Sequence, residues 1–320
     1  MTRGLGASAE ELLAWRKSVG GGADRVAVVG GTFHILQPGN IAALRQARLR
    51  ARHVCVLVEP DNAGGGRPGK RPDVSLAERM EMLAHLKDVD IIASATAPAA
   101  GDILQALRPY SWVRCNRQVD GPLAQQAADL AERHEPIPLL PGCFTPDILA
   151  AIRSGSTPMH LPHAFRGRRG AKVGRGRKRR LVTINGCFDV LHIGHLRFLA
   201  QARAKGDELV VLINNDESVR RYKGDDRPVF PLRFRAAALL ALKSVTAVRS
   251  FHEDNPLRLI SELKPDIHVK GGTYEPDRVD AERRLLATWG GRVAFCQMVE
   301  GRSTTGYLTK VGNTPGLTAR

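Results

Sequence analysis

The sequence predicts an α/β protein with two tandem domains, each built around a doubly wound parallel sheet. Three observations support this fold class. Short apolar runs alternate with segments whose apolar residues recur at helical spacing, as strands and their crossover helices do. The second half of the chain repeats the first at a nearly constant offset. A segment rich in Gly and Arg separates the halves and has the composition of a linker.

The repeat aligns residues 25–40 with residues 180–195, an offset of 155 that becomes 156 after one inserted residue. Identical pairs continue along both halves: Leu44/Leu199, Ala47/Ala202, Arg48/Arg203, Asp61/Asp216, Arg79/Arg235 and Val113/Val269. We therefore infer two copies of one domain. The predicted divisions are an N-terminal arm (1–24), a first domain (25–155), a basic linker (156–179) and a second domain (180–320).

Apolar runs in the second domain predict strands at 181–184, 209–213, 247–251, 267–269 and 292–297. Apolar residues at helical spacing predict helices at 194–205, 233–242 and 256–263. This alternation favours a parallel, Rossmann-like sheet with right-handed crossovers. Ligands bind such sheets beyond the carboxyl ends of the strands. We expect residues 185–195, 214–216, 270–274 and 303–305 to converge there.

Composition narrows the class of protein. The 320 residues suffice for two domains, no apolar run is long enough to span a bilayer, and residues 1–15 lack the pattern of a secretory signal. The five cysteines are far apart and form no CxxC pair, so neither a disulfide framework nor a zinc site is indicated. We expect a cytoplasmic protein with no membrane partner.

The net charge of +16 is unevenly distributed. Residues 166–180 hold nine Lys or Arg and no acid, which is more than half of the excess. A Gly-rich run of like charges favours a solvated, self-repelling hinge, although a non-specific contact with a polyanion stays open. We do not expect nucleic acid to be the main partner.

The candidate chemistry centres on His192-Ile193-Gly194-His195 at the start of a predicted helix. A helix N-terminus offers unpaired N–H groups and a positive dipole end, which suit phosphate. Residues at i and i+3 share a face, so both imidazoles can reach one ligand, and Gly194 permits close backbone approach.

The surrounding residues resemble the cytidylyltransferase-like nucleotidyltransferase family. Asn185-Gly186-Cys187-Phe188-Asp189-Val190-Leu191-His192-Ile193-Gly194-His195 resembles its first signature, and Glu300-Gly301-Arg302-Ser303-Thr304-Thr305 its second. Arg221-Tyr222-Lys223-Gly224-Asp225-Asp226-Arg227-Pro228 resembles its mobile lysine segment. This segment and Val269-Lys270-Gly271-Gly272-Thr273-Tyr274 are most similar to the branch that makes ADP-heptose from heptose 1-phosphate. The resemblance covers residues 180–311.

The resemblance implies transfer of a nucleoside monophosphate from an NTP, expected to be ATP, to a sugar 1-phosphate, with release of pyrophosphate. An acceptor oxygen attacks the α-phosphorus in line, so catalysis is positioning and charge stabilisation without a protein nucleophile. Positively charged His192 and His195 are expected on the α/β-phosphates, with Lys223 opposite. Mg²⁺ would be held mainly by phosphate oxygens and water, not by a protein site.

The remaining site residues have expected roles in binding. Ser303, Thr304 and Thr305 would donate to the β/γ-phosphates, and Arg227 and Arg302 are candidates for the sugar phosphate. Nucleotide contacts are also expected from Asn185, Gly186, Cys187, Phe188, Asp189, Gly194, Asp216, Lys270, Gly271 and Gly272. Asp189 would orient the loop or cap the helix. Lys270 is expected to bind either the acceptor phosphate or the nucleotide. Cys187 is expected to be a packing residue and not a reactive thiol.

The first domain keeps the pattern but lacks these groups. His34, Gln37 and Asn40 replace Asp189, His192 and His195, while Arg114-Cys115-Asn116 and Phe144-Thr145-Pro146 replace the Lys270 and Ser303 motifs. Gln and Asn cannot carry positive charge, so we expect a catalytically inactive copy. It would form an intrachain pseudo-dimer with the second domain, and a further homo-oligomer stays open. A regulatory ligand near Arg67, Lys70 and Arg71 is the rival hypothesis.

Two other functions stay open from the sequence. One keeps the family but uses CTP with glycerol 3-phosphate or another phosphoalcohol. The other belongs to a different class, a non-catalytic nucleotide sensor or nucleic-acid-binding protein that uses the basic linker.

Overall fold

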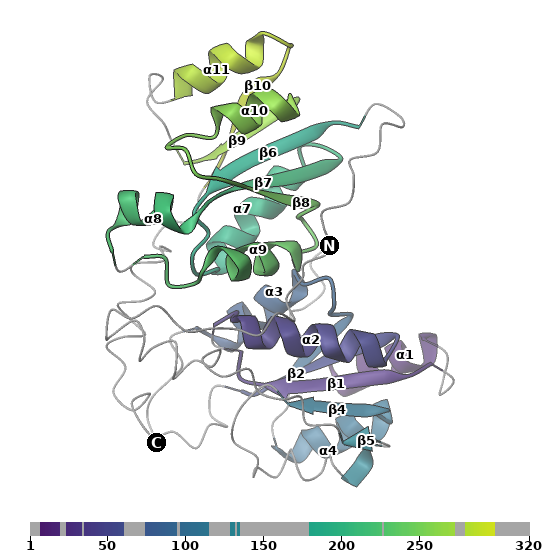
Figure 1. Ribbon diagram of the computed structural model, residues 1–320. Helices are drawn as coiled ribbons and strands as arrows, with labels where there is room; N and C mark the ends of the chain where they lie inside the picture. Colours follow the sequence, from purple (N-terminus) through teal and green to yellow (C-terminus); the bar gives the residue numbers. More distant parts are fainter. Residues whose placement is uncertain are drawn as a thin grey trace. The chain divides into compact units, whose positions relative to one another are not determined.

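The computed structural model describes residues 7–19, 24–33, 35–60, 74–94, 97–114, 129–131, 133–134, 179–225, 227–272 and 279–297. The chain separates into two compact units (Figure 1). Their described parts lie within residues 7–134 and 179–297. The predicted linker lies outside the described residues apart from Arg179. No described helix is both long enough and apolar enough to cross a bilayer.

The second unit contains a five-stranded parallel sheet. Its strands are β6 (Leu181–Gly186), β7 (Glu208–Asn214), β8 (Ala247–Phe251), β9 (Ile267–Gly271) and β10 (Arg292–Cys296). Their order is β10-β9-β6-β7-β8, and every neighbouring pair is parallel. The chain builds outward from β6 in one direction and then returns to build in the other. The boundary between β6 and β9 is therefore the topological switch point, where ligands bind on doubly wound sheets.

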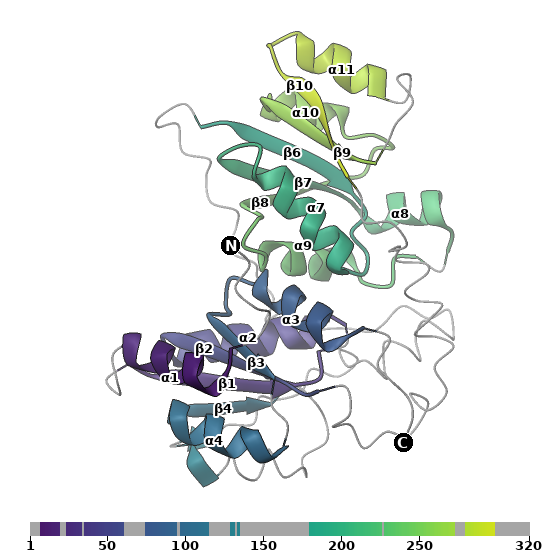
Figure 2. The same cartoon turned by 180° about the vertical axis from the view of Figure 1, so that it is seen from behind.

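Helices cover both faces of this sheet. They are α7 (Ile193–Arg203), α8 (Asp216–Lys223), α9 (Leu232–Leu240), α10 (Leu257–Leu263) and α11 (Asp280–Ala287). Residues of α10 and α11 pack with Val210 and Leu212 of β7, whereas α7 lies on the opposite face (Figures 1 and 2). The sequence prediction missed α8 and α11. Helix α8 buries only Ser218 and Val219, and α11 buries only Glu282 and Leu286. Neither helix therefore has a broad apolar stripe.

The first unit has the same strand order. Its strands are β1 (Val26–Gly31), β2 (His53–Val58), β3 (Ile91–Ser94), β4 (Ser111–Arg114) and β5 (Arg133–His134), and its helices are α1 (Ala9–Ser18), α2 (Pro38–Arg50), α3 (Leu76–Ala84) and α4 (Ala97–Leu107). The sheet order β3-β2-β1-β4-β5 corresponds strand by strand to the second sheet. The two parallel sheets with alternating helices confirm the predicted fold class. Descent from one duplicated domain stays a prediction from the sequence.

The segment expected to be an N-terminal arm contains α1, which packs into the first unit. Leu12 is fully buried in a core shared with Val28, Leu104 and Trp112. Arg16 Nε donates to the Leu107 carbonyl at 2.8 Å and its Nη1 to the Asp24 carbonyl at 3.1 Å. This helix is therefore an integral part of the core.

A buried arginine holds the carboxyl-end loops of each sheet. In the second unit, Arg235 donates to the carbonyls of Phe230 at 2.9 Å and Cys187 at 2.6 Å, and to the Asp216 carboxylate at 2.7 Å. In the first unit, Arg79 donates to three carbonyls, those of Val74, Thr32 and Glu59 at 3.3, 2.5 and 2.8 Å. Five donors in a fixed fork make arginine suited to gathering several loops at one point.

A buried polar pair joins the central strands of the second sheet. Thr183 Oγ1 lies 2.9 Å from Nδ1 of His268, and both residues are fully buried. Burial, with the nearby charge of Lys270 second, lowers the pKa of His268 to about 3. The imidazole is therefore neutral in the folded protein throughout the physiological range.

The buried histidine predicts a loss of stability in mild acid. The folded pKa of His268, about 3, lies below its ordinary value of 6.5. The contribution of the neutral imidazole to the free energy of unfolding is therefore present in full above pH 6.5 and is lost as pH falls toward 3. At about pH 5.5 the loss from this group is about 1.4 kcal/mol. Hydrogen exchange of the β9 amides at two pH values measures it. His268→Gln, which can still bond to Thr183, should reduce the pH dependence, and an unchanged dependence contradicts this cause.

Candidate active site

The His192–His195 segment lies at the start of α7, directly after β6 and its loop. His192 is the residue before the first turn, and its carbonyl accepts the N–H of His195 at 2.9 Å. Gly194 is buried within that turn. Phe188 enters the loop with a φ of 46°, and its first-unit counterpart Phe33 has a φ of 52°. Both units therefore use the same unusual loop backbone to bring a helix N-terminus to the end of the central strand.

The two imidazoles are stacked. The ring centroids of His192 and His195 lie 3.8 Å apart with an interplanar angle of 29°, and Phe188 meets the His195 ring edge-on at 5.5 Å. His192 is 4% exposed. Nδ1 of His195 is buried and has no hydrogen-bond partner among the described residues.

The surroundings of His195 disfavour its charged form in the ligand-free site. Burial, followed by the charges of His192 and Lys223, lowers the pKa of His195 to about 3, although a backbone hydrogen bond at Val190 opposes the shift. Without ligand, the imidazole is neutral at neutral pH. Burial beside two other basic groups disfavours the charged ring, so the expected positive charge on the phosphates stays a prediction for the ligand-bound site.

Asp189 joins the histidine loop to the segment that follows α8. Its carboxylate is fully buried and accepts from Arg227 Nη1 and from the backbone N–H groups of Val229 and Phe230, each at 3.0 Å. Of the two predicted roles, orientation of a loop is observed, whereas no side-chain cap forms at the start of α7. Arg227, a candidate for the sugar phosphate, is bound to this carboxylate.

Lys223 lies in the last turn of α8, beside the histidine loop. Its charge acts to lower the pKa of both His195 and Cys187. Asp216 begins the same helix, and its Oδ1 accepts from the Leu232 N–H at 2.8 Å and from Arg235. The described contacts of Asp216 hold loops together, and a contact with ribose or base stays a prediction.

Cys187 has the environment of a packing residue. Burial is the largest influence on the thiol and raises its pKa, outweighing the opposing charges of Lys223 and Arg235. Its Sγ lies 3.8 Å from Asn214 Oδ1. At Gly186, an added Cβ would lie 3.0 Å from the Phe188 ring, so glycine lets the aromatic ring fold back onto the strand.

Lys270 lies at the switch point, held from two sides. Its Nζ donates to Asn185 Oδ1 at 3.0 Å and forms an ion pair with Glu282 Oε1 at 2.7 Å. The two charged side chains are only 12% and 9% exposed. Gly271 ends β9, and Gly272 follows with a φ of 85° and donates to the Cys296 carbonyl. Sequence reasoning missed Glu282, since one Glu in a polar helix carries no motif.

The first unit has different groups at the corresponding places. Asn40 Oδ1 accepts the backbone N–H of Gln37 at 3.2 Å, so it caps the start of α2. At the end of β1, an added Cβ on Gly30 would lie only 2.6 Å from the Trp112 ring. Gly30 aligns with Asn185, and Trp112 with His268. In the first unit, the Trp112 indole thus covers the end of β1, the position that corresponds to Asn185 on β6.

Several predicted site residues lie outside the described residues. They are Arg302, Ser303, Thr304 and Thr305 in the second unit, and His34, Arg67, Lys70, Arg71, Cys115, Asn116 and residues 144–146 in the first. The other predicted residues lie in connected segments. Asp189 in the loop before α7 binds Arg227, and Arg235 links Cys187 of that loop to Asp216 of α8, the helix that also bears Lys223. Lys270 joins them through Asn185.

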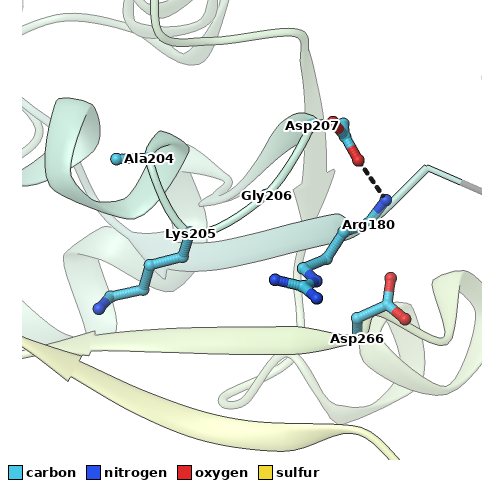
Figure 3. Close-up of a pocket in the computed structure, with 6 residues that line it drawn as sticks. All are labelled: Arg180, Ala204, Lys205, Gly206, Asp207 and Asp266. Carbon is cyan, nitrogen blue, oxygen red and sulfur yellow. Dashed lines mark hydrogen bonds between the residues drawn. The ribbon is translucent and has the colours of Figure 1, made fainter.

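A hollow of about 550 Å³ lies at the other end of the second sheet (Figure 3). It is lined by Arg180, Ala204, Lys205, Gly206, Asp207 and Asp266. Asp207 accepts the Arg180 N–H at 2.8 Å, and Asp266 accepts the Leu181 N–H at 2.7 Å. Because its residues precede β6, β7 and β9, the hollow lies at the opposite end of these strands from His192, His195 and Lys270.

The Cytidylyltransferase-like family model matches residues 28–135 and 183–300, which together form more than half of the chain. The chain belongs to the cytidylyltransferase-like family. Both units match the model separately, in agreement with their common strand order.

Curated relatives and one solved structure are similar to part of the chain. Bifunctional protein HldE of Geotalea uraniireducens (strain Rf4) is 48% identical over 44% of this chain and 28% of its own length. Bifunctional protein HldE of Proteus mirabilis (strain HI4320) is 38% identical over 54% of this chain and 41% of its own length. The chain thus spans less than half of these relatives. A crystal structure of the lipopolysaccharide core biosynthesis protein from Thermoplasma volcanium GSS1 is 28% identical, covers 39% of this chain and 99% of that chain, and has a TM-score of 0.33.

The depressed pKa of His195 gives a prediction for ligand binding. Without nucleotide, its ring resonances should not titrate between pH 8 and about pH 4, because its pKa is about 3. A bound polyanion favours the protonated ring, so adding Mg²⁺–ATP should raise the pKa and cause proton uptake. NMR titration with and without nucleotide measures both. A ligand-free midpoint near 6.5 contradicts the neutral imidazole.

Replacing Asp189 by Asn should destabilise the second unit by about 2–4 kcal/mol. The amide removes the negative charge opposite Arg227. Its NH₂ group would also face one of the three donors that the carboxylate accepts from, namely Arg227 and the N–H groups of Val229 and Phe230. Denaturant unfolding followed by hydrogen exchange of the residues after Pro228 measures the effect. Asp280→Asn is the matched control, because its carboxylate pairs with Arg283 and Arg284 at the surface. Equal effects of the two variants would show that the Asp189 contacts have no special weight.

Proposed function

We propose that the second unit is a nucleotidyltransferase that joins the AMP part of ATP to a heptose 1-phosphate and releases pyrophosphate. The observation that carries the proposal is the stacked His192–His195 pair at the N-terminus of α7, directly beyond the central strand. Family membership supports nucleotidyl transfer. The HldE relatives, and the similarity of residues 221–228 and 269–274 to the ADP-heptose branch, support the base and the acceptor.

The reaction is a single displacement at phosphorus. An oxygen of the acceptor phosphate forms a bond to the α-phosphorus, and the bond from that phosphorus to the bridging α,β-oxygen breaks. The electron pair leaves with pyrophosphate. The transition state spreads negative charge over phosphate oxygens, so the protein contributes positioning and electrostatic stabilisation. ATP enters as its magnesium complex, with the ion held mainly by phosphate oxygens and water.

Each group at the α7 end has a defined part in this step. His192 and His195 donate hydrogen bonds to the α- and β-phosphates, and the N–H groups of the helix start add further donors. The exposed side chain of Lys223 supplies one positive charge to the triphosphate. A proton taken up by His195 when the polyanion binds adds a second charge at the leaving group. Asp189 keeps the histidine loop and the segment after α8 in register through Arg227 and two backbone N–H groups.

We propose that the first unit does not catalyse this transfer. Asn40 is engaged in capping α2, and Trp112 covers the strand end at Gly30. Gln37 is neutral at every pH. The expected pairing of the two units within the chain, and any association of two chains, stay predictions.

A pyrophosphate-release assay tests the function. The full chain is incubated with Mg²⁺, each of the four NTPs, and heptose 1-phosphate, other sugar 1-phosphates or glycerol 3-phosphate. Release with ATP and heptose 1-phosphate is the expected result. Release only with CTP and glycerol 3-phosphate would replace the proposed substrates but keep the reaction. No release with any pair, together with salt-sensitive RNA or DNA binding, would overturn the proposal.

Two substitutions, one in each unit, distinguish the units. His195→Ala should lower kcat about 100- to 1,000-fold, the cost of losing a transition-state donor, without unfolding the chain. Gln37→Ala, at the first-unit position that aligns with His192, should leave kcat within about twofold, since uncoupled sites act independently. Steady-state kinetics and thermal unfolding measure both variants. A comparable loss in Gln37→Ala would show that the first unit takes part in catalysis.

A further inference from the structure

We propose that the ion pair between Lys270 and Glu282 binds a sugar hydroxyl and not a phosphate, and so recognises the ribose of the nucleotide or the sugar ring of the acceptor. This inference rests on the proposed function of the second unit and narrows the role of Lys270. It also gives Glu282 a role in substrate recognition.

The pair lies where the topology places a ligand. Strand order reverses between β6 and β9, and Lys270 at the end of β9 reaches across that boundary to Asn185 at the end of β6. Glu282 approaches from α11, the crossover helix that follows β9. Three elements thus fix one ammonium group at the switch point, beside the loop that leads to the histidines.

The hydrogen-bond inventory leaves room for one hydroxyl. An ammonium group has three N–H donors; Lys270 donates one to Asn185, and a second faces its ion-pair partner Glu282 Oε1 at 2.7 Å. Oε2 of the Glu282 carboxylate accepts no hydrogen bond from the described residues, whereas Oε1 forms the ion pair with Lys270. One remaining donor beside one remaining acceptor matches a hydroxyl group, which both accepts and donates. A phosphate oxygen offers only acceptors and would be repelled by the carboxylate.

The charge balance points the same way. The Lys270–Glu282 pair has no net charge and is largely buried, so it attracts a polyanion weakly. Lys223 differs, because it is exposed and has no ion pair among the described residues. The second unit therefore separates its two lysines. Lys223 supplies net positive charge near the histidines, and Lys270 supplies an oriented donor at the switch point.

The hydrogen bond is best tested with matched ligands that have or lack a sugar. Calorimetry measures dissociation constants of the full chain for Mg²⁺–ATP against Mg²⁺–tripolyphosphate, and for heptose 1-phosphate against inorganic phosphate. Glu282→Gln leaves Lys270 charged but less well held. It should weaken the sugar-bearing member of one pair about tenfold, the value of one hydrogen bond to a charged group, and should leave the sugar-free member unchanged.

The pattern of changes identifies the source of the hydroxyl. Loss confined to ATP assigns the ribose, and loss confined to heptose 1-phosphate assigns the acceptor ring. Equal weakening of sugar-free and sugar-bearing ligands, tighter binding of tripolyphosphate, or no change in any ligand would overturn the proposal. Wild-type protein that binds a sugar-bearing ligand no better than its sugar-free partner would also overturn it.

Controls separate recognition from folding and from catalysis. Lys270→Gln removes the buried charge together with its donor geometry, and should reproduce the selective loss if Glu282→Gln fails to fold. Glu262→Gln removes an exposed carboxylate paired with Arg258 and should change none of the four constants. Because binding is measured without turnover, a protein that binds these ligands but releases no pyrophosphate would contradict the proposed reaction and leave this inference standing.

Discussion

The reversal of strand order at β6 is the constraint on which the rest of the second unit depends. Because the chain builds first toward β8 and then toward β10, the ends of β6 and β9 are left without a crossover helix between them. The β6–α7 loop, the end of β9 and the start of α8 all open on that side. Asp189 and Arg235 then fix these segments through buried hydrogen bonds, so the polar groups are positioned before any ligand arrives.

Burial determines which groups carry charge at the carboxyl end of β6 and β9. The His192 and His195 rings are stacked, and burial lowers the pKa of His195, so this imidazole is neutral in the ligand-free site. Positive charge resides on Lys223, and the charge of Lys270 is balanced by Glu282. Such a site is stable without ligand because it contains no cluster of unbalanced charges. The proposed reaction requires it to gain positive charge as the phosphates enter.

Much of this arrangement was predictable from the sequence, for identifiable reasons. Continuous apolar runs such as Leu209–Ile213 predicted the parallel strands, and the repeat of residues 25–40 at 180–195 predicted two units with one topology. The polar helices α8 and α11 escaped prediction because each buries only two residues. Glu282 escaped because it meets Lys270 only through the fold. The role of Arg235 was visible only as an identity with Arg79, and the neutral state of His195 depends on burial that no motif records.

The central claim is that the nucleotide binds at the switch-point end of the second sheet. A crystal structure of the full chain with Mg²⁺ and a non-hydrolysable ATP analogue tests it most directly. We expect the α- and β-phosphates within hydrogen-bond distance of His192 and His195, and a sugar hydroxyl of the nucleotide or of added heptose 1-phosphate beside Lys270 and Glu282. A nucleotide bound only in the first unit, or in the second unit away from the start of α7, would contradict the claim.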